Sequence, residues 1–298
     1  MQETKVVTQT RKDTRRLPGS DGLIPVPGRE DHFFLKAEVI RLLERVELLS
    51  ERHPVNVLVV GPQGCGKSTL VRQFAARFNR PLAVFQVGIL SEAGQLFGEH
   101  RLEEGRTYFN EFLFPKAVRT PRCVIHLEEI NRPEHPKALN MLLSLLAEDR
   151  SVWIDEIGRV DVAPGVVFFA TMNEGEEFVG TEMLDAALRD RFYIVALDYL
   201  PPEVETQVLR LKANLGEADA LTVVNVANRL RTNRNDPVTV STRHTLMIAE
   251  MVGLGASAKD AFVSGLQVGR DTLETVLLSV HLEGRLPGGE EKDEYHEY

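Results

Sequence analysis

One short stretch in the first quarter of the chain carries the residue types that bind phosphate. It follows the pattern of glycine, four residues, then Gly-Lys-Ser, and it consists of Gly61, Pro62, Gln63, Gly64, Cys65, Gly66, Lys67, Ser68 and Thr69. Its glycines let the backbone turn its N–H groups towards phosphate oxygens. The ammonium of Lys67 would reach the terminal phosphates, and the hydroxyl of Ser68 would ligate Mg²⁺. The stretch therefore predicts a binding site for a nucleoside triphosphate.

Two adjacent carboxylates follow an apolar run further along the chain. Glu128 and Glu129 come directly after Cys123–Leu127, which is predicted to be a buried strand. Ligands of open α/β sheets bind at the carboxyl ends of the strands. One carboxylate there can hold Mg²⁺, directly or through water, and the other can accept a proton from an attacking water. The alternative is a pair of surface acids, and the phosphate-binding stretch upstream favours the catalytic interpretation.

The flanking segments supply the elements that the phosphate-binding stretch requires. Val55–Val60 reads as a buried strand, and Leu70–Phe78 has apolar residues at helical spacing. Strands and helices then alternate as far as Leu197, which predicts an α/β fold, the three-layer αβα sandwich of a P-loop NTPase with a parallel sheet. From Pro201 the pattern becomes entirely helical. The predicted organisation is a flexible arm over residues 1–22, a nucleotide-binding domain over 23–200, an α-helical lid domain over 201–283 and a disordered acidic tail over 284–298.

Composition narrows the class of protein. The chain is 43% hydrophobic, which is enough for a substantial core, and its formal net charge of −9 argues against a dedicated binder of nucleic acid. Its two cysteines do not suggest a disulfide framework, and a reducing compartment is the simpler interpretation. No apolar run approaches the length of a membrane span. We therefore expect a soluble, cytoplasmic protein without a membrane partner.

Together these features resemble the AAA+ ATPases and, within them, the MoxR branch, over roughly Ile24–Leu282. Gly61–Thr69 matches the Walker A motif of the family, and Leu127–Arg132 matches its Walker B motif, which continues Ile-Asn-Arg as it does here. The family normally has Asp-Glu where this chain has Glu128-Glu129. The resemblance implies that Glu129 is the catalytic carboxylate and that Glu128 joins Ser68 at the metal. The extra methylene of Glu128 moves its carboxylate by about a bond length, which bears on metal geometry and hydrolysis rate.

The resemblance also assigns roles to polar residues elsewhere. Asn173, after the strand Val166–Thr171, resembles sensor 1 and would lie near the attacking water. Arg191, with Arg189 as a second candidate, resembles the arginine that reaches the nucleotide of a neighbouring subunit. Arg243, at the start of a lid helix, resembles sensor 2. Without the resemblance, Asn173 is a common turn residue and the arginines are solvated side chains.

Two segments match the insertions of the MoxR branch. Gly88–Tyr108 falls where the helix-2 insert would be, and Val152–Val162 matches the pre-sensor-1 hairpin; in relatives such elements face a central pore and contact a substrate or partner. Trp153, on the second segment, is expected to be packed. His126 is expected to be a core-strand histidine, because no Cys/His cluster at ligand spacing accompanies it.

The resulting hypothesis is an ATP- and Mg²⁺-dependent ATPase that forms a homo-oligomeric ring, a hexamer. It would couple hydrolysis to chaperone-like remodelling of a protein client, with a von Willebrand A-domain adaptor as partner. One alternative is a nucleic-acid motor or a translocase subunit of the restriction type, which the acidic charge does not favour. Another is a nucleotide-gated binding module with little hydrolysis, in which Glu128 makes a defective metal site.

Overall fold

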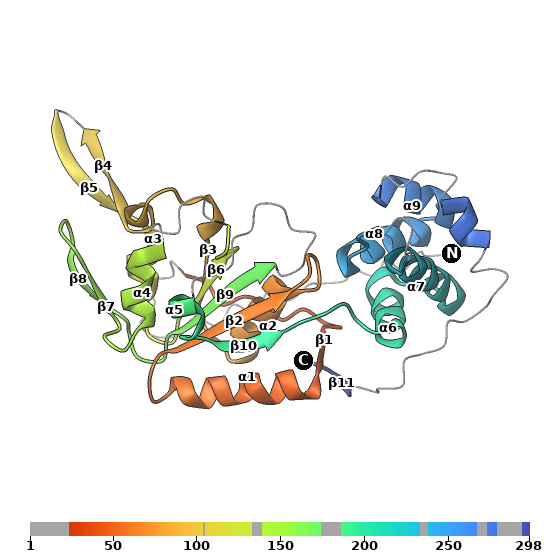
Figure 1. Ribbon diagram of the computed structural model, residues 1–298, viewed down its shortest axis with the longest axis horizontal. Helices are drawn as coiled ribbons and strands as arrows, with labels where there is room; N and C mark the ends of the chain where they lie inside the picture. The colour runs from red at the N-terminus through yellow and green to blue at the C-terminus, as the bar shows by residue number, and fades with distance from the viewer. Residues whose placement is uncertain are drawn as a thin grey trace, which may run out of the picture.

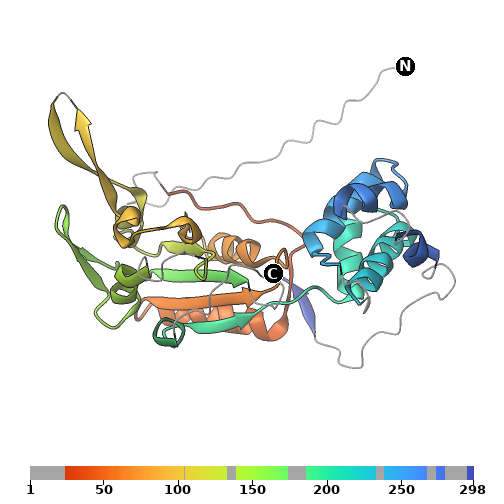
Figure 2. The same ribbon diagram turned by 45° about the horizontal axis from the view of Figure 1, so that its top comes forward.

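The computed structural model describes residues 24–103, 105–132, 139–173, 186–232, 238–266, 273–278 and 294–298. These residues form an α/β part and a helical part, joined after residue 200 (Figures 1 and 2). The arm predicted over residues 1–22 lies outside the described residues, as do residues 284–293 of the predicted tail. The domain boundaries themselves remain predictions.

A five-stranded parallel sheet forms the centre of the α/β part. The strands are β2 (Val55–Gly61), β3 (Leu82–Gln86), β6 (Val124–Glu128), β9 (Val167–Asn173) and β10 (Tyr193–Ala196), in the order β10-β2-β9-β6-β3. All seven residues of β2 are buried, as expected of a central parallel strand that is covered on both faces. The predicted α/β sandwich with a parallel sheet is therefore confirmed.

Helices cover both faces of this sheet, and the alternation of side chains along β2 shows which helix lies on which face. Val57 and Val59 pack with α1 (Ala37–Ser50) and α2 (Lys67–Arg77). Leu58 and Val60 point the other way and pack with α3 (Leu113–Val118) and α4 (Asn140–Leu146). Short helix α5 (Ala186–Arg189) precedes β10.

The helical part has a hydrophobic core of its own. Its helices are α6 (Pro202–Ala213), α7 (Glu217–Arg231), α8 (Thr242–Gly253), α9 (Ala258–Leu266) and a helical stretch over residues 273–278. Val223, Ile248 and Phe262, from three of these helices, are fully buried together. The separate core agrees with the predicted helical lid.

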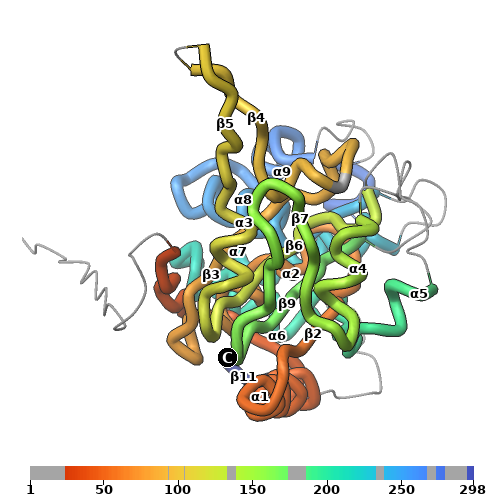
Figure 3. Tube along the Cα trace, turned by 90° about the vertical axis from the view of Figure 1, so that its left-hand side faces the viewer, coloured from red at the N-terminus to blue at the C-terminus, as the bar shows by residue number. Residues whose placement is uncertain are grey.

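The two predicted insertions are both β-hairpins, and they project from the same side of the α/β part (Figure 3). Two short 3₁₀ helices, η1 (Val87–Ile89) and η2 (Ala93–Leu96), lead into the first hairpin, β4 (Gly98–Glu103) and β5 (Arg106–Glu111). The second hairpin is β7 (Ser151–Ile154) and β8 (Gly158–Asp161). Strand β5 continues to Glu111, and helix α3 begins directly after it, at Leu113.

Two expectations from the sequence are wrong. Trp153 is not packed: 66% of its surface is exposed, because the two-stranded hairpin leaves this face of β7 open to solvent. The tail is not disordered over its whole length either. Residues 295–297 form β11 (Tyr295–Glu297), which pairs antiparallel with β1 (Phe34–Lys36), and Tyr298 is buried. Pairing with β1 gives the backbone N–H and C=O groups of β11 hydrogen-bond partners within the protein. The acidic composition of the tail predicted that these groups would stay in water.

A buried arginine ties the elements together at the amino-terminal end of the sheet. The Arg80 side chain is fully buried and donates hydrogen bonds to Glu47 Oε2 (2.6 Å) and to the carbonyl oxygen of Gly165 (2.6 Å). Burial lowers the pKa of Arg80, and the hydrogen bond to Glu47 opposes that shift. A buried charge of this kind is stable only while its partners stay in place.

We expect Arg80→Ala to lower the free energy of unfolding by about 3 kcal/mol, because it removes the donor from Glu47 Oε2 and from the buried Gly165 carbonyl, although Arg122 still donates to Glu47 Oε1. Urea unfolding followed by circular dichroism measures this. Arg159→Ala is the control, because the Arg159 side chain is 63% exposed and bonds an exposed Asp161. Equal stability of the two variants would show that the Arg80 contacts contribute nothing.

Candidate nucleotide-binding site

The loop between β2 and α2 has the conformation that a phosphate cradle requires. Gly66, the residue before α2, has a φ of 101°, in the left-handed region that favours glycine. Gly64 also has a positive φ, and a β-carbon added there would lie 2.6 Å from the side chain of Ser241 in the helical part. These glycines let the loop reverse direction and bring its N–H groups to the N-terminus of α2, which favours anions.

Lys67 lies at the centre of this loop and is nearly buried. Its ammonium donates to the carbonyl oxygens of Gly61 (2.9 Å) and Pro62 (2.6 Å), both of which are neutral. Burial lowers the pKa of Lys67; Arg243 adds to this shift, and Cys65 and Glu129 oppose it. A buried cation that is hydrogen-bonded to neutral carbonyls is strongly stabilised when an anionic ligand binds beside it. The loop is therefore suited to a phosphate group.

Glu128 and Ser68 form a pair of oxygen donors beside the loop. The Ser68 hydroxyl donates to Glu128 Oε1 at 2.8 Å, and the Gln86 amide donates to Glu128 Oε2. Hard oxygen ligands of this kind suit Mg²⁺, which in nucleotide sites is held by one or two protein groups together with phosphate and water. No larger cluster of His, Cys, Asp and Glu at metal-binding spacing occurs among the described residues. The donor set thus fits a Mg²⁺ ion that arrives with a nucleotide.

Glu129 directly follows β6 and has an unusual backbone. Its φ is 55°, a left-handed conformation that costs a non-glycine residue about 1 kcal/mol, and such strain concentrates at functional sites. Its carboxylate accepts a hydrogen bond from Arg132 Nη1 at 2.9 Å. Both side chains of this pair are partly exposed, so the ion pair holds Glu129 only weakly.

A cavity of about 220 Å³ brings most of the predicted residues together. Asn173 reaches it from the end of β9, where it lies opposite Gly61 in the β2–β9 register. Arg243 reaches it from the second position of α8, whose N-cap Ser241 accepts a hydrogen bond from the His244 N–H. The cavity is lined by Gln63, Gly64, Gly66, Lys67, Ser68, Thr69, Gln86, Glu128, Glu129, Thr171, Met172, Asn173 and Arg243.

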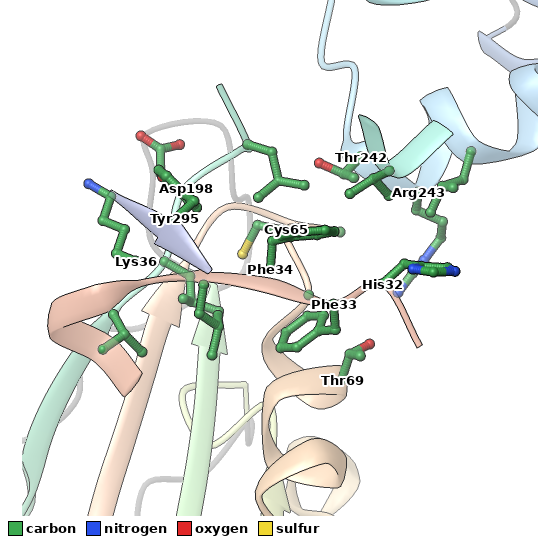
Figure 4. A pocket seen from close by; sticks show the side chains of 18 of the residues that line it. His32, Phe33, Phe34, Lys36, Cys65, Thr69, Asp198, Thr242, Arg243 and Tyr295 are labelled. Atoms are coloured by element: carbon green, nitrogen blue, oxygen red, sulfur yellow. The ribbon is translucent and has the colours of Figure 1, made fainter. Parts of the chain in front are cut away.

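A second cavity, of about 240 Å³, adjoins the first and was not predicted from the sequence. It lies between the α/β part and the helical part and shares Gly64, Gly66, Thr69 and Arg243 with the phosphate cavity. Its other walls are largely apolar, and they include Phe33, Phe34, Leu197, Val208 and Leu246 (Figure 4). An apolar pocket beside a phosphate cradle fits a base and a ribose.

Arg189 and Arg191 are not part of either cavity. They precede β10, at the end of the parallel sheet opposite the phosphate loop (Figure 1). Arg191 donates to the carbonyl oxygen of Ala187 and lies 3.5 Å from Asp190. Its own backbone carbonyl accepts a hydrogen bond from the buried amide of Asn56 (3.0 Å). Within one chain these arginines therefore do not reach the nucleotide site.

His126 lies behind Glu128 on β6 and is buried. Its Nε2 is 3.2 Å from the Thr171 hydroxyl, and burial lowers its pKa to about 3, so the ring is neutral. His126 is therefore a buried histidine of a core strand, as expected from the sequence.

Comparisons with known proteins identify the family. Residues 56–192 match the AAA domain of the dynein-related subfamily. BssE of Thauera aromatica, described as a candidate chaperone, is 58% identical over 260 residues, which cover 87% of this chain and 91% of that protein. The chain therefore belongs to the AAA+ ATPases, in their dynein-related, MoxR-like branch.

More distant similarities support the same assignment. Protein NorQ of Paracoccus denitrificans is 28% identical over 70% of this chain and 78% of its own length. Among solved structures, RuvB of Thermotoga maritima (P216G mutant) matches with a TM-score of 0.54 at 19% identity, covering 87% of this chain and 74% of that one. That likeness shows the P-loop NTPase fold. No helix in the described ranges is long and apolar enough to cross a membrane.

We expect Lys67→Ala to weaken binding of a non-hydrolysable ATP analogue about a hundredfold, because it removes the buried charge that meets the terminal phosphates. Isothermal titration calorimetry measures the dissociation constant. Lys116→Ala, in α3 and outside both cavities, is the matched control. Unchanged affinity in Lys67→Ala would contradict the assignment of the phosphate loop.

Proposed function

We propose that this protein hydrolyses ATP to ADP and phosphate in a ring of identical subunits, a hexamer, and that it uses the energy to remodel a protein client. The observation that carries the ATPase proposal is the phosphate cavity, which gathers Lys67, Ser68, Glu128, Glu129 and Asn173 at one edge of the sheet. Membership of the AAA+ family and the P-loop fold support it.

Each residue of the cavity has a role that suits its chemistry. Lys67 and the loop N–H groups bind the phosphates, and Ser68 with Glu128 would hold Mg²⁺, which neutralises charge on the phosphate oxygens. Glu129 accepts the proton of the attacking water once it leaves Arg132. Asn173 orients that water. Arg243, at the start of a lid helix, brings a positive charge to the phosphates when the lid closes.

The position of Arg191 and Arg189 supports the proposed ring. These side chains lie at the end of the sheet away from their own nucleotide cavity, so any nucleotide that they reach belongs to a neighbouring subunit. The buried Asn56 amide holds the backbone of Arg191 in place. An arginine donated in trans neutralises charge that develops on the γ-phosphate, and it acts only when subunits meet.

The hairpins provide the surface for a client or adaptor. Leu102 on β4 is 74% exposed, and Trp153 on β7 and Tyr108 on β5 are also exposed. The hairpins are connected, since His100 Nε2 lies 3.1 Å from Glu156 Oε1. We propose that these hairpins contact the client or a von Willebrand A-domain adaptor, in keeping with the resemblance to the MoxR branch and with the chaperone description of the relative BssE.

Subunit mixing tests the shared site. We expect Arg191→Ala to lower ATP hydrolysis on the order of 10³-fold with little change in nucleotide affinity, because the arginine acts on charge in the transition state. Mixing it with Glu129→Gln subunits should restore activity, since a mixed interface pairs an intact Glu129 with an intact Arg191. Arg189→Ala is tested in parallel as the second candidate. Full activity in Arg191→Ala and Arg189→Ala monomers, independent of protein concentration, would refute the ring.

A further inference from the structure

Residues 294–298, here named the return segment, follow the helical part in sequence but dock on the α/β part. Strand β11 of this segment pairs with β1, with Phe34 opposite Glu297 and Lys36 opposite Tyr295. Two further backbone bonds extend the pairing: Ala37 N–H to the Glu294 carbonyl (2.8 Å) and Tyr298 N–H to the Phe33 carbonyl (2.7 Å). Figure 2 shows the segment lying between the two parts of the molecule.

Side chains hold the return segment in place. Tyr298 is only 3% exposed, and the guanidinium of Arg77 lies 4.6 Å from the centre of its ring. Arg29 donates to the Tyr298 carbonyl oxygen at 2.9 Å, and Glu297 accepts from the His32 N–H at 2.7 Å. A tail that stays in solvent would leave its tyrosine exposed. The burial of Tyr298 therefore indicates that the return segment docks at a specific site.

Strand β1 depends on this docking. It is not part of the five-stranded sheet, and within the described residues β11 is its one strand partner. Lys36, the N-cap of α1, makes no side-chain cap, and the first free N–H of that helix, at Ala37, is satisfied by Glu294 of the return segment. Removal of the segment would leave β1 and the start of α1 without these bonds.

Strand β1 is in turn a wall of the second cavity, the pocket suited to a base and ribose. Phe33, Phe34 and Lys36 line that cavity, and so does Tyr295 of the return segment itself (Figure 4). The Phe33 ring packs against the phosphate loop, since a β-carbon on Gly66 would lie 3.3 Å from it. A continuous path of contacts thus leads from the return segment through β1 to the loop that holds phosphate.

We propose that the return segment contributes to nucleotide binding. Its docking on β1 forms one wall of the base pocket and thereby raises the affinity for nucleotide. By thermodynamic reciprocity, bound nucleotide strengthens the docking by the same factor. This inference rests on the proposed nucleotide-binding function of the two cavities.

The test compares ADP affinity in three variants of the full protein: a chain that stops after Asp293, Tyr298→Ala and Glu294→Ala. Glu294→Ala is the matched control, because the Glu294 side chain is 80% exposed and only its backbone oxygen bonds Ala37. We expect the truncation and Tyr298→Ala to weaken binding of fluorescent ADP roughly tenfold, within the usual range for coupled sites, and the control to match wild type.

Hydrogen exchange supplies a second readout, which reports the docking of the return segment both without and with nucleotide. The amides of Ala37 and Tyr298 should exchange faster in Tyr298→Ala, and ADP should slow exchange of both in the wild type. Tyr295→Ala keeps the backbone pairing of β11 with β1 and should still weaken ADP binding, because Tyr295 lines the base pocket. This variant tests the inference even if the truncated chain fails to fold. Wild-type ADP affinity in Tyr298→Ala together with fast exchange would overturn the inference. Failure of the wild type to bind ADP would instead refute the nucleotide-binding function.

Discussion

The parallel register of β2, β9 and β6 decides which residues meet at the nucleotide cavity. Gly61 at the end of β2 lies opposite Asn173 at the end of β9, and β6, which pairs with β9, ends at Glu128. Because parallel strands all end at one edge, residues more than 100 positions apart in the chain meet around one cavity. A shift of one residue in any of these strands would turn its side chains to the other face and disperse the site.

The charges around this edge are held by weak or neutral partners. Lys67 is bound by two carbonyl oxygens, and Glu129 is bound by a partly exposed Arg132. Exposed ion pairs contribute at most about 1 kcal/mol, so Glu129 can exchange Arg132 for a water at little cost. Glu128 differs, because both of its oxygens have donors, in Ser68 and Gln86. Glu128, which stands where the family normally has aspartate, is thus held in place by hydrogen bonds from Ser68 and Gln86 despite its longer side chain.

Local sequence patterns were sufficient to predict the phosphate loop, the core strands and the helical lid. Each of these has a signal within a few residues: a glycine pattern, an apolar β-branched run or helical spacing. The pairing of β1 with β11 had no such signal, because it joins three residues to three others some 260 positions away and leaves no periodic pattern. The base pocket was missed for the same reason, since its walls come from β1, β10 and the lid, which only the tertiary structure brings together. The exposure of Trp153 depends on which face of its hairpin remains uncovered, and the hairpin sequence does not contain that information.

The proposed hydrolysis depends on two carboxylate roles: Glu129 is the base, and Glu128 serves the metal. Single-turnover hydrolysis of ATP over a range of Mg²⁺ concentrations, in Glu129→Gln beside Glu128→Gln, distinguishes these two roles. We expect Glu129→Gln to bind ATP as the wild type does but to cleave it about 10²- to 10⁴-fold more slowly at every Mg²⁺ concentration, because an amide cannot accept the proton of the attacking water. We expect the defect of Glu128→Gln to be relieved in part as the Mg²⁺ concentration rises. Wild-type turnover in Glu129→Gln would rule out Glu129 as the base.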